Sequence, residues 1–141
     1  MQTVVVNNAA VIVAALAQFA IGFFWYGPLF GKAWLKLIGV SASVMGSAKG
    51  SDMVKPMIIS LIQALITAYV LAHVLAFAET KTVYEGLQGA FWVWLGFVAT
   101  TSASSYVWDP TGKKNWKLWK LDNGYYLASL LAMSAIIAAW V

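Results

Sequence analysis

The sequence predicts an all-α membrane protein in which four transmembrane helices form two antiparallel hairpins, with a short amphipathic helix at the membrane surface after the first span. The chain of 141 residues is 62% hydrophobic and only 10% charged, whereas soluble domains carry about 25% charged residues. Four stretches are apolar over about 20 residues, the length that crosses a bilayer. The nine basic residues are all lysines, and eight of them lie in two of the three connections. These features predict a single transmembrane domain over residues 1–141.

The first span is expected over residues 4–26. Pro28 should end it, because proline has no amide donor and restricts Gly27 before it. In residues 29–38 the apolar side chains share one side of a helix and Lys32 and Lys36 the other, which is typical of a helix lying in the headgroup plane. Residues 39–51 are rich in Gly, Ser and Ala and predict a linker. The remaining spans are expected over residues 57–78, 87–107 and 121–141.

The lysines predict the orientation of the spans. Four of them lie between Lys32 and Lys55, four lie between Lys113 and Lys120, and the middle connection holds Lys81 alone. With four spans, the two lysine-rich connections fall on the same side of the membrane. Lysine-rich loops face the cytoplasm, so we expect both termini on the opposite side.

Each span has a face of small or polar residues. We expect these faces to point to the interior of the bundle, because helices in lipid associate through close packing and polar contacts. The faces comprise Asn8, Val11, Ala15, Gln18, Gly22 and Trp25 on the first span; Ser60, Gln63, Thr67 and Val74 on the second; Gly89, Trp92, Gly96, Ala99, Ala103 and Tyr106 on the third; and Asp122, Tyr125, Ser129, Ala132, Ile136 and Ala139 on the fourth.

Four polar residues within the first two spans are candidates for an intramembrane lining: Asn8, Gln18, Gln63 and Thr67. Gln18 and Gln63 are expected near mid-depth, where lipid cannot satisfy an amide. The sequence leaves two alternatives open for them, an interhelical hydrogen bond or the lining of a path for a solute. His73 is the only histidine and a candidate titratable group, or a partner in an ordinary hydrogen bond.

Lysine and tryptophan side chains alternate in the two lysine-rich connections. They are candidate contacts for anionic lipids, or ordinary determinants of topology with no ligand. These residues are Lys32, Trp34, Lys36, Lys113, Lys114, Trp116, Lys117, Trp119 and Lys120. Asp109 and Asp122 lie on the same side of the membrane and are expected to form local ion pairs. We expect no nucleic acid as a partner, because the lysines flank apolar runs and form no continuous stripe.

The sequence contains no cysteine, and none of the phosphate-binding, zinc-binding or hydrolase motifs. We therefore expect no catalytic residue, metal, cofactor or enzymatic activity. The leading hypothesis is a protein that acts by assembly, with itself or as an accessory subunit of a membrane complex. One alternative is a carrier or channel for a small polar solute or ion, and another is a protein that binds anionic lipids at the interface.

Three segments carry a resemblance to a known family. They are WYGPLFGKAW after the first span, WLGFVAT within the third, and LDNGYYLASLLAM at the start of the fourth. Their order and content resemble the small bacterial membrane proteins grouped as domain of unknown function 1761. The resemblance implies a bacterial inner-membrane protein of four helices, here with both termini in the periplasm. It implies no activity, substrate or site residue.

Overall fold

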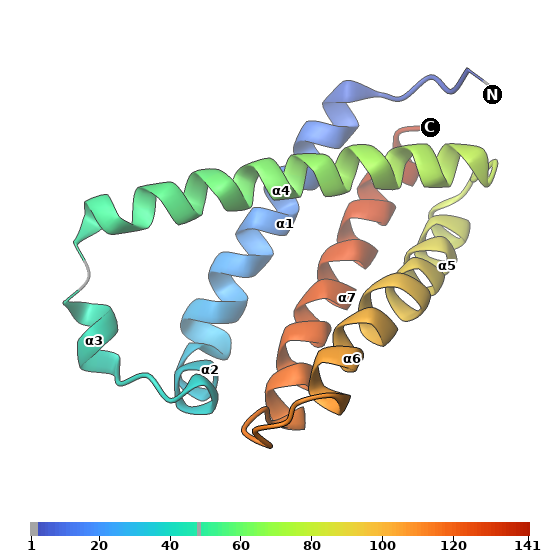
Figure 1. Ribbon diagram of the computed structural model, residues 1–141. Helices are drawn as coiled ribbons and strands as arrows, with labels where there is room; N and C mark the ends of the chain where they lie inside the picture. Colours follow the sequence, from blue (N-terminus) through green and yellow to red (C-terminus); the bar gives the residue numbers. More distant parts are fainter. Residues whose placement is uncertain (1–2, 48) are drawn as a thin grey trace.

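A computed structural model describes residues 3–47 and 49–141, and its regular elements over these residues are all helical (Figure 1). The first long helix, α1 (Asn8–Phe24), continues into a π-helical turn, η1 (Trp25–Leu29). Two short helices, α2 (Gly31–Ile38) and α3 (Ala42–Gly46), lead to α4 (Gly50–Phe77). A third helical stretch comprises α5 (Val83–Val93), the π-helical η2 (Trp94–Ala99) and α6 (Thr100–Val107), and α7 (Trp116–Ala139) follows.

The first long helix begins later than residue 4, the predicted start. Asn7 caps it, because its side chain accepts hydrogen bonds from the N–H groups of Ala9 and Ala10. The helix ends where Pro28 predicts, since Gly27 leaves helical geometry with φ −107° and ψ −107°. Beyond this kink lies α2, a short helix within the residues 29–38 predicted to be helical.

The second long helix begins seven residues earlier than predicted, at Gly50 rather than residue 57. Its first turn is capped, because the backbone N–H of Lys49 donates to the Asp52 carboxylate at 3.1 Å. The predicted linker over 39–51 is therefore partly helical, and it also contains α3. The Gly, Ser and Ala residues of this stretch lower helix propensity but do not forbid a helix, which is why the linker prediction was too broad.

Three helical stretches are long and apolar enough to cross a membrane: Asn8–Leu29, Gly50–Phe77 and Trp116–Ala139. The continuous stretch from Val83 to Val107 is not among them, because Gln, Gly, Ser and Thr residues dilute its apolar content. The protein is thus a helical protein with three candidate membrane-spanning helices, and these suggest a multi-pass membrane protein.

The arrangement differs from two antiparallel hairpins. The stretch α5–η2–α6 runs antiparallel to α7, as predicted, but α4 crosses α1 and α7 steeply instead of lying alongside α1 (Figure 1). Residues 50–63 of α4 are all exposed, so the N-terminal half of this helix projects from the bundle. The crossing is close because α1 presents Ala14 and Ala15 to Ala64 and Ala68 of α4, and each of the four is at most 1% exposed.

The helix α7 is the centre of the bundle, since it packs against α1 on one side and α5 on the other. Its buried residues include Leu130, Met133 and Ile137, which complete the core with the alanines of α1 and α4. Gly86 of α5 allows a close approach to α7, because a Cβ at this position would lie 2.9 Å from the Cβ of Ala138.

Two predicted helix faces were wrong in phase. On α4 the buried residues are Ala64, Ala68, Leu71, Ala72 and Leu75, a face that lies one residue beyond Gln63 and Thr67, or about 100° around the helix. Alanine permits a closer approach than an amide, so the polar side chains lie at the edge of the contact. On the third stretch Trp92 and Gly96 are exposed, whereas Ala99 is buried as predicted. The phase already differs in α5, where Gly86 and Ala90 are the buried residues.

Candidate functional site

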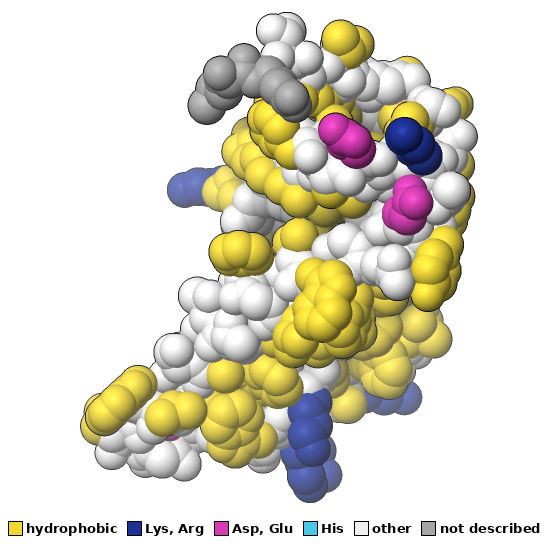
Figure 2. Space-filling model, turned by 90° about the vertical axis from the view of Figure 1, so that its right-hand side faces the viewer, with side chains coloured by type: hydrophobic (Ala, Val, Ile, Leu, Met, Phe, Trp, Pro, Cys, Tyr) yellow, Lys and Arg dark blue, Asp and Glu magenta, His cyan; other side chains and the backbone are white. Residues whose placement is uncertain are grey.

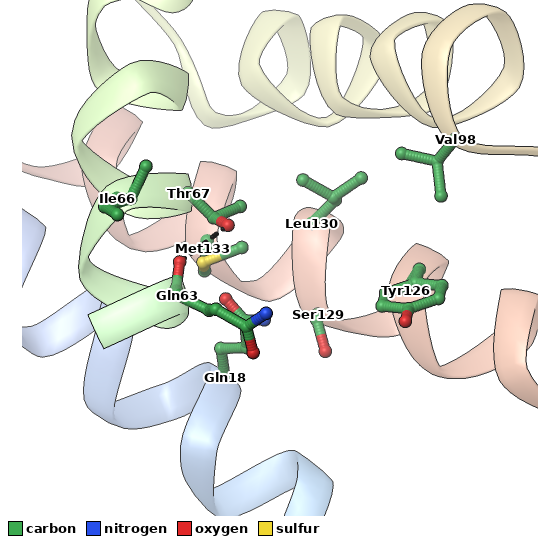
Figure 3. Close-up of a pocket in the computed structure, with 9 residues that line it drawn as sticks. All are labelled: Gln18, Gln63, Ile66, Thr67, Val98, Tyr126, Ser129, Leu130 and Met133. Atoms are coloured by element: carbon green, nitrogen blue, oxygen red, sulfur yellow. Dashed lines mark hydrogen bonds between the residues drawn. The ribbon is translucent and has the colours of Figure 1, made fainter. Parts of the chain in front are cut away.

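A cavity of about 360 Å³ lies where α4 crosses the bundle. Gln18 of α1 and Gln63 of α4, both lining residues, extend toward one another (Figure 3). Residues of α7 form its floor, and Val98 of η2 closes one side. The lining comprises Gln18, Gln63, Ile66, Thr67, Val98, Tyr126, Ser129, Leu130 and Met133. None of these described lining residues carries a formal charge at neutral pH, and the cavity volume falls in the range of small-molecule sites.

Two polar atoms of the lining are buried and lack a hydrogen-bond partner among the described residues. They are the amide oxygen Oε1 of Gln18 and the hydroxyl Oγ of Ser129. Ser129 is 1% exposed and borders the cavity. The Thr67 hydroxyl is already committed as a donor to the backbone oxygen of Gln63, at 2.8 Å. The cavity therefore contains unused hydrogen-bonding capacity, which a ligand or ordered water would satisfy.

The structure brings together three of the four residues predicted as a polar lining. Gln18, Gln63 and Thr67 all line the cavity. Asn8 does not, since it is exposed at the first turn of α1. Sequence reasoning did not single out Ser129 and Tyr126 of α7 as lining residues, although Ser129 lay on the face predicted to be interior. The missing information was how α4 crosses the bundle, which the sequence pattern does not encode.

Tryptophan side chains attach the start of α7 to both of its neighbours. The indole N–H of Trp25 donates to the carbonyl of Leu121 at 3.1 Å, and that of Trp94 donates to the carbonyl of Asn123 at 3.0 Å. Asn123 is 3% exposed, and its side-chain oxygen accepts from Ser102. The three segments that carry the family resemblance thus converge on one place. There they hold α7, the helix that provides the cavity floor.

The two aspartates on the lysine-rich side have other partners than the predicted lysine side chains. Asp122 accepts a hydrogen bond from the hydroxyl of Tyr26 at 2.7 Å, so the prediction of an ion pair was wrong in its partner. Asp109 accepts from the hydroxyl of Thr111 and from the backbone N–H of Lys114. These hydrogen bonds, that of Thr111 foremost, lower the pKa of Asp109 below its ordinary value and close the turn before α7.

His73 makes an ordinary hydrogen-bond contact, one of the two alternatives that the sequence left open. Its Nδ1 lies 2.9 Å from the backbone oxygen of Tyr69, one helical turn earlier, and its ring lies 4.4 Å from the Tyr69 ring. Within residues 3–47 and 49–141, no three His, Asp or Glu side chains are grouped closely enough to hold a metal ion. His73 is therefore placed outside the cavity, against its own helix.

The candidate lipid contacts lie in different environments, some exposed and some bonded within the protein. The charged side chains on the face in Figure 2 lie toward its upper and lower ends, and the middle of that face is uncharged. Lys32 and Lys36 are exposed on α2. Lys114 donates to the carbonyl of Ser105 at 3.0 Å. The indole of Trp119 points inward, because its N–H donates to the Ser102 hydroxyl at 3.0 Å.

Comparison with known proteins shows a match to one protein family. The family model described as "Protein of unknown function (DUF1761)" matches residues 9–138. No curated protein and no solved structure matches the chain. The match covers every long helix, and thus both the cavity and the tryptophan contacts.

Proposed function

The chain belongs to the DUF1761 family of proteins of unknown function, and from its cavity we propose that it is a membrane protein that binds a small, uncharged, polar molecule within the bilayer. The observation that carries this proposal is the pair of unpartnered atoms, Gln18 Oε1 and Ser129 Oγ, at one cavity. An unsatisfied polar group in a low-dielectric interior costs about 1–3 kcal/mol. A ligand that supplies the missing hydrogen bonds recovers that cost.

The chemistry of the lining defines the class of ligand. Gln18 offers an acceptor, Ser129 can donate or accept, and the Gln63 amide can do both. The apolar walls, such as Leu130 and Met133, suit a short carbon skeleton. No charged residue is among the described lining residues, so a charged ligand would be desolvated without compensation. A polyol or a small amide fits these conditions.

Two buried serines of α7 allow a matched test of whether polar molecules reach the cavity. Ser129 and Ser134 are 1% and 0% exposed, and the Oγ of each lacks a partner among the described residues. Ser129 lines the cavity, but Ser134 does not. In this cysteine-free chain, Ser129→Cys should react with a small water-soluble methanethiosulfonate, and Ser134→Cys should stay unmodified. Equal reactivity of the two cysteines would remove the support for an accessible cavity.

If the protein is a carrier, it must also speed the passage of its ligand across a membrane. Proteoliposomes should take up at least one of glycerol, urea and acetamide faster than protein-free liposomes, as followed by osmotic swelling. Gln18→Leu and Gln63→Leu should each reduce this rate, because leucine has a similar size but no hydrogen-bonding group. If swelling is unaffected by both substitutions, the protein binds without transporting, or the lining is irrelevant. Binding to the Ser129 region, measured by protection of Ser129→Cys, separates these outcomes.

We further propose that four spans cross the membrane, with both lysine-rich connections in the cytoplasm and both termini in the periplasm. The continuous helical stretch from Val83 to Val107, antiparallel to α7, supports the additional span. The helix α4 is itself one of the three candidate membrane-spanning helices. Single cysteines at Ser47, Thr82 and Thr111 test this topology in intact spheroplasts. Position 82 alone should react with an impermeant maleimide.

Assembly is the second candidate function, and the exposed N-terminal half of α4 favours it. Its exposed side chains include Met57, Ile58 and Ile62, and we propose that a second copy of the chain covers part of this surface. Ile58→Cys should then form an intermolecular disulfide in native membranes. Phe97→Cys, at an exposed position of η2, serves as the control. A single monomeric species in blue-native gels, together with equal crosslinking at both positions, would contradict self-assembly.

A further inference from the structure

A second cavity, of about 670 Å³, opens at the end of the bundle where α4 passes into α5. It is separate from the cavity at Gln18. Its floor is apolar, and Leu75 and Ile137 on that floor are 2% and 6% exposed. The lining residues Glu79, Thr80 and Lys81, which follow α4 in the chain, form its rim. The described lining comprises Val5, Val6, Asn7, Ala72, Leu75, Ala76, Glu79, Thr80, Lys81, Ile137, Trp140 and Val141.

Glu79 occupies a backbone position that favours glycine. The end of α4 is a complete Schellman motif, because the Thr80 N–H donates to the Leu75 carbonyl and the Glu79 N–H donates to the Ala76 carbonyl, both at 3.0 Å. The residue after the C-cap must then be left-handed, and Glu79 has φ 53°. A side chain is disfavoured there, and strain of this kind clusters at functional positions. This observation is independent of the cavity itself.

We propose that this second cavity is a binding site for a zwitterionic phospholipid with an ethanolamine headgroup. The two rim charges have opposite sign and are two residues apart, which complements a headgroup with an ammonium at one end and a phosphate at the other. The Glu79 carboxylate accepts hydrogen bonds from the ammonium, and Lys81 pairs with the phosphate. The upper part of an acyl chain lies on the apolar floor, beside the half-exposed ring of Trp140.

The charges on the rim select among the common phospholipids. Phosphatidylglycerol has no cation for Glu79, so its binding leaves that carboxylate unpaired. Phosphatidylcholine has a cation, but its methylated nitrogen cannot donate a hydrogen bond. The primary ammonium of phosphatidylethanolamine satisfies both requirements. A peptide or a soluble zwitterion would satisfy the rim charges but leave the apolar floor uncovered.

Native mass spectrometry of the purified protein tests the site. The probe is an equimolar mixture of phosphatidylethanolamine, phosphatidylcholine and phosphatidylglycerol with identical acyl chains. The wild-type chain should retain phosphatidylethanolamine at least threefold more than either other lipid. Glu79→Gln should abolish this preference. Matched controls are Asp52→Asn and Lys55→Gln, which neutralise exposed charges at the other end of α4, and these should leave the preference unchanged.

Glu79→Gly separates lipid binding from folding. Glycine adopts the left-handed conformation without strain, so this variant should melt at a higher temperature than the wild-type protein in lipid-free detergent. It should nevertheless lose the preference for phosphatidylethanolamine. Preferential retention of phosphatidylglycerol by the wild-type protein, or an unchanged preference in Glu79→Gln or Glu79→Gly, would overturn the proposal.

Discussion

Replacing Gly86 by alanine should loosen the contact between α5 and the central helix α7. The new Cβ would lie 2.9 Å from the Cβ of Ala138 and 3.1 Å from the backbone oxygen of Ser134. Neither atom can rotate away, so one helix must shift. Overpacking of this kind costs about 1–3 kcal/mol, and alanine in place of helical glycine returns about 0.5–1 kcal/mol. We expect Gly86→Ala to lower the free energy of unfolding by up to about 2.5 kcal/mol.

Two other glycines calibrate this prediction. A Cβ at Gly96 would meet no described atom within 4 Å, so Gly96→Ala should show the helix-propensity gain alone. A Cβ at Gly89 would lie 3.0 Å from Cδ2 of Leu75, the flexible end of a side chain. Gly89→Ala should therefore fall between the other two variants. Unfolding by dodecyl sulfate in mixed micelles, followed by tryptophan fluorescence, gives the three values. If Gly86→Ala proves as stable as Gly96→Ala, the close α5–α7 contact is refuted.

Three further predictions follow from the same contacts. Trp94→Phe should lower the free energy of unfolding by about 0.6–1.7 kcal/mol, the range for one interhelical hydrogen bond in a membrane. Trp92→Phe, at an exposed position, should change that free energy little. Equal losses in the two variants would contradict the role of the Trp94 indole. Gly31→Ala should disorder the junction of η1 and α2, as judged by faster amide exchange in α2, because its Cβ would lie 2.7 Å from a backbone oxygen of η1. The pKa of Glu85 lies below its ordinary 4.5, chiefly because its carboxylate accepts a hydrogen bond from the backbone N–H of Lys81. The stabilisation that this carboxylate gives the α4–α5 turn is therefore present above pH 4.5 and is lost as the pH falls through the lowered pKa. Amide exchange in the turn should show this loss, and Glu85→Gln should abolish its pH dependence.

The sequence predicted the helical class and the approximate C-terminal ends of the long helices, whereas it misplaced their starts. Pro28 ends the first span through its own missing donor, whichever other helices are present. The start of α4 was missed because a capping contact between Lys49 and Asp52 outweighs the weak propensity of the residues around it. The crossing of α4 was also missed, since it depends on the fit of alanines that lie far apart in the sequence.

The candidate site was predicted in part. Gln18 and Gln63 could be predicted as lining residues because an amide within an apolar span needs a hydrogen-bond partner. That argument requires no knowledge of the neighbouring helices. Ser129 and Tyr126 line the cavity because α7 lies between α1 and α5, an arrangement that their sequence context does not indicate. A serine in an apolar helix can bond to its own backbone, so its type alone does not distinguish a lining residue from a buried one.

The central position of α7 has a consequence for biogenesis. This helix is translated after all the others described here, yet α1 and α5 both pack against it and the indoles of Trp25 and Trp94 bond to its backbone. Until α7 leaves the translocon, those indoles have no partner on α7, and the face of α5 that packs on α7 is uncovered. The contact between α1 and α4 can therefore form early, whereas α5 joins the bundle only with α7. A ribosome stalled before Trp116 emerges should hold a chain that quality-control proteases readily cleave.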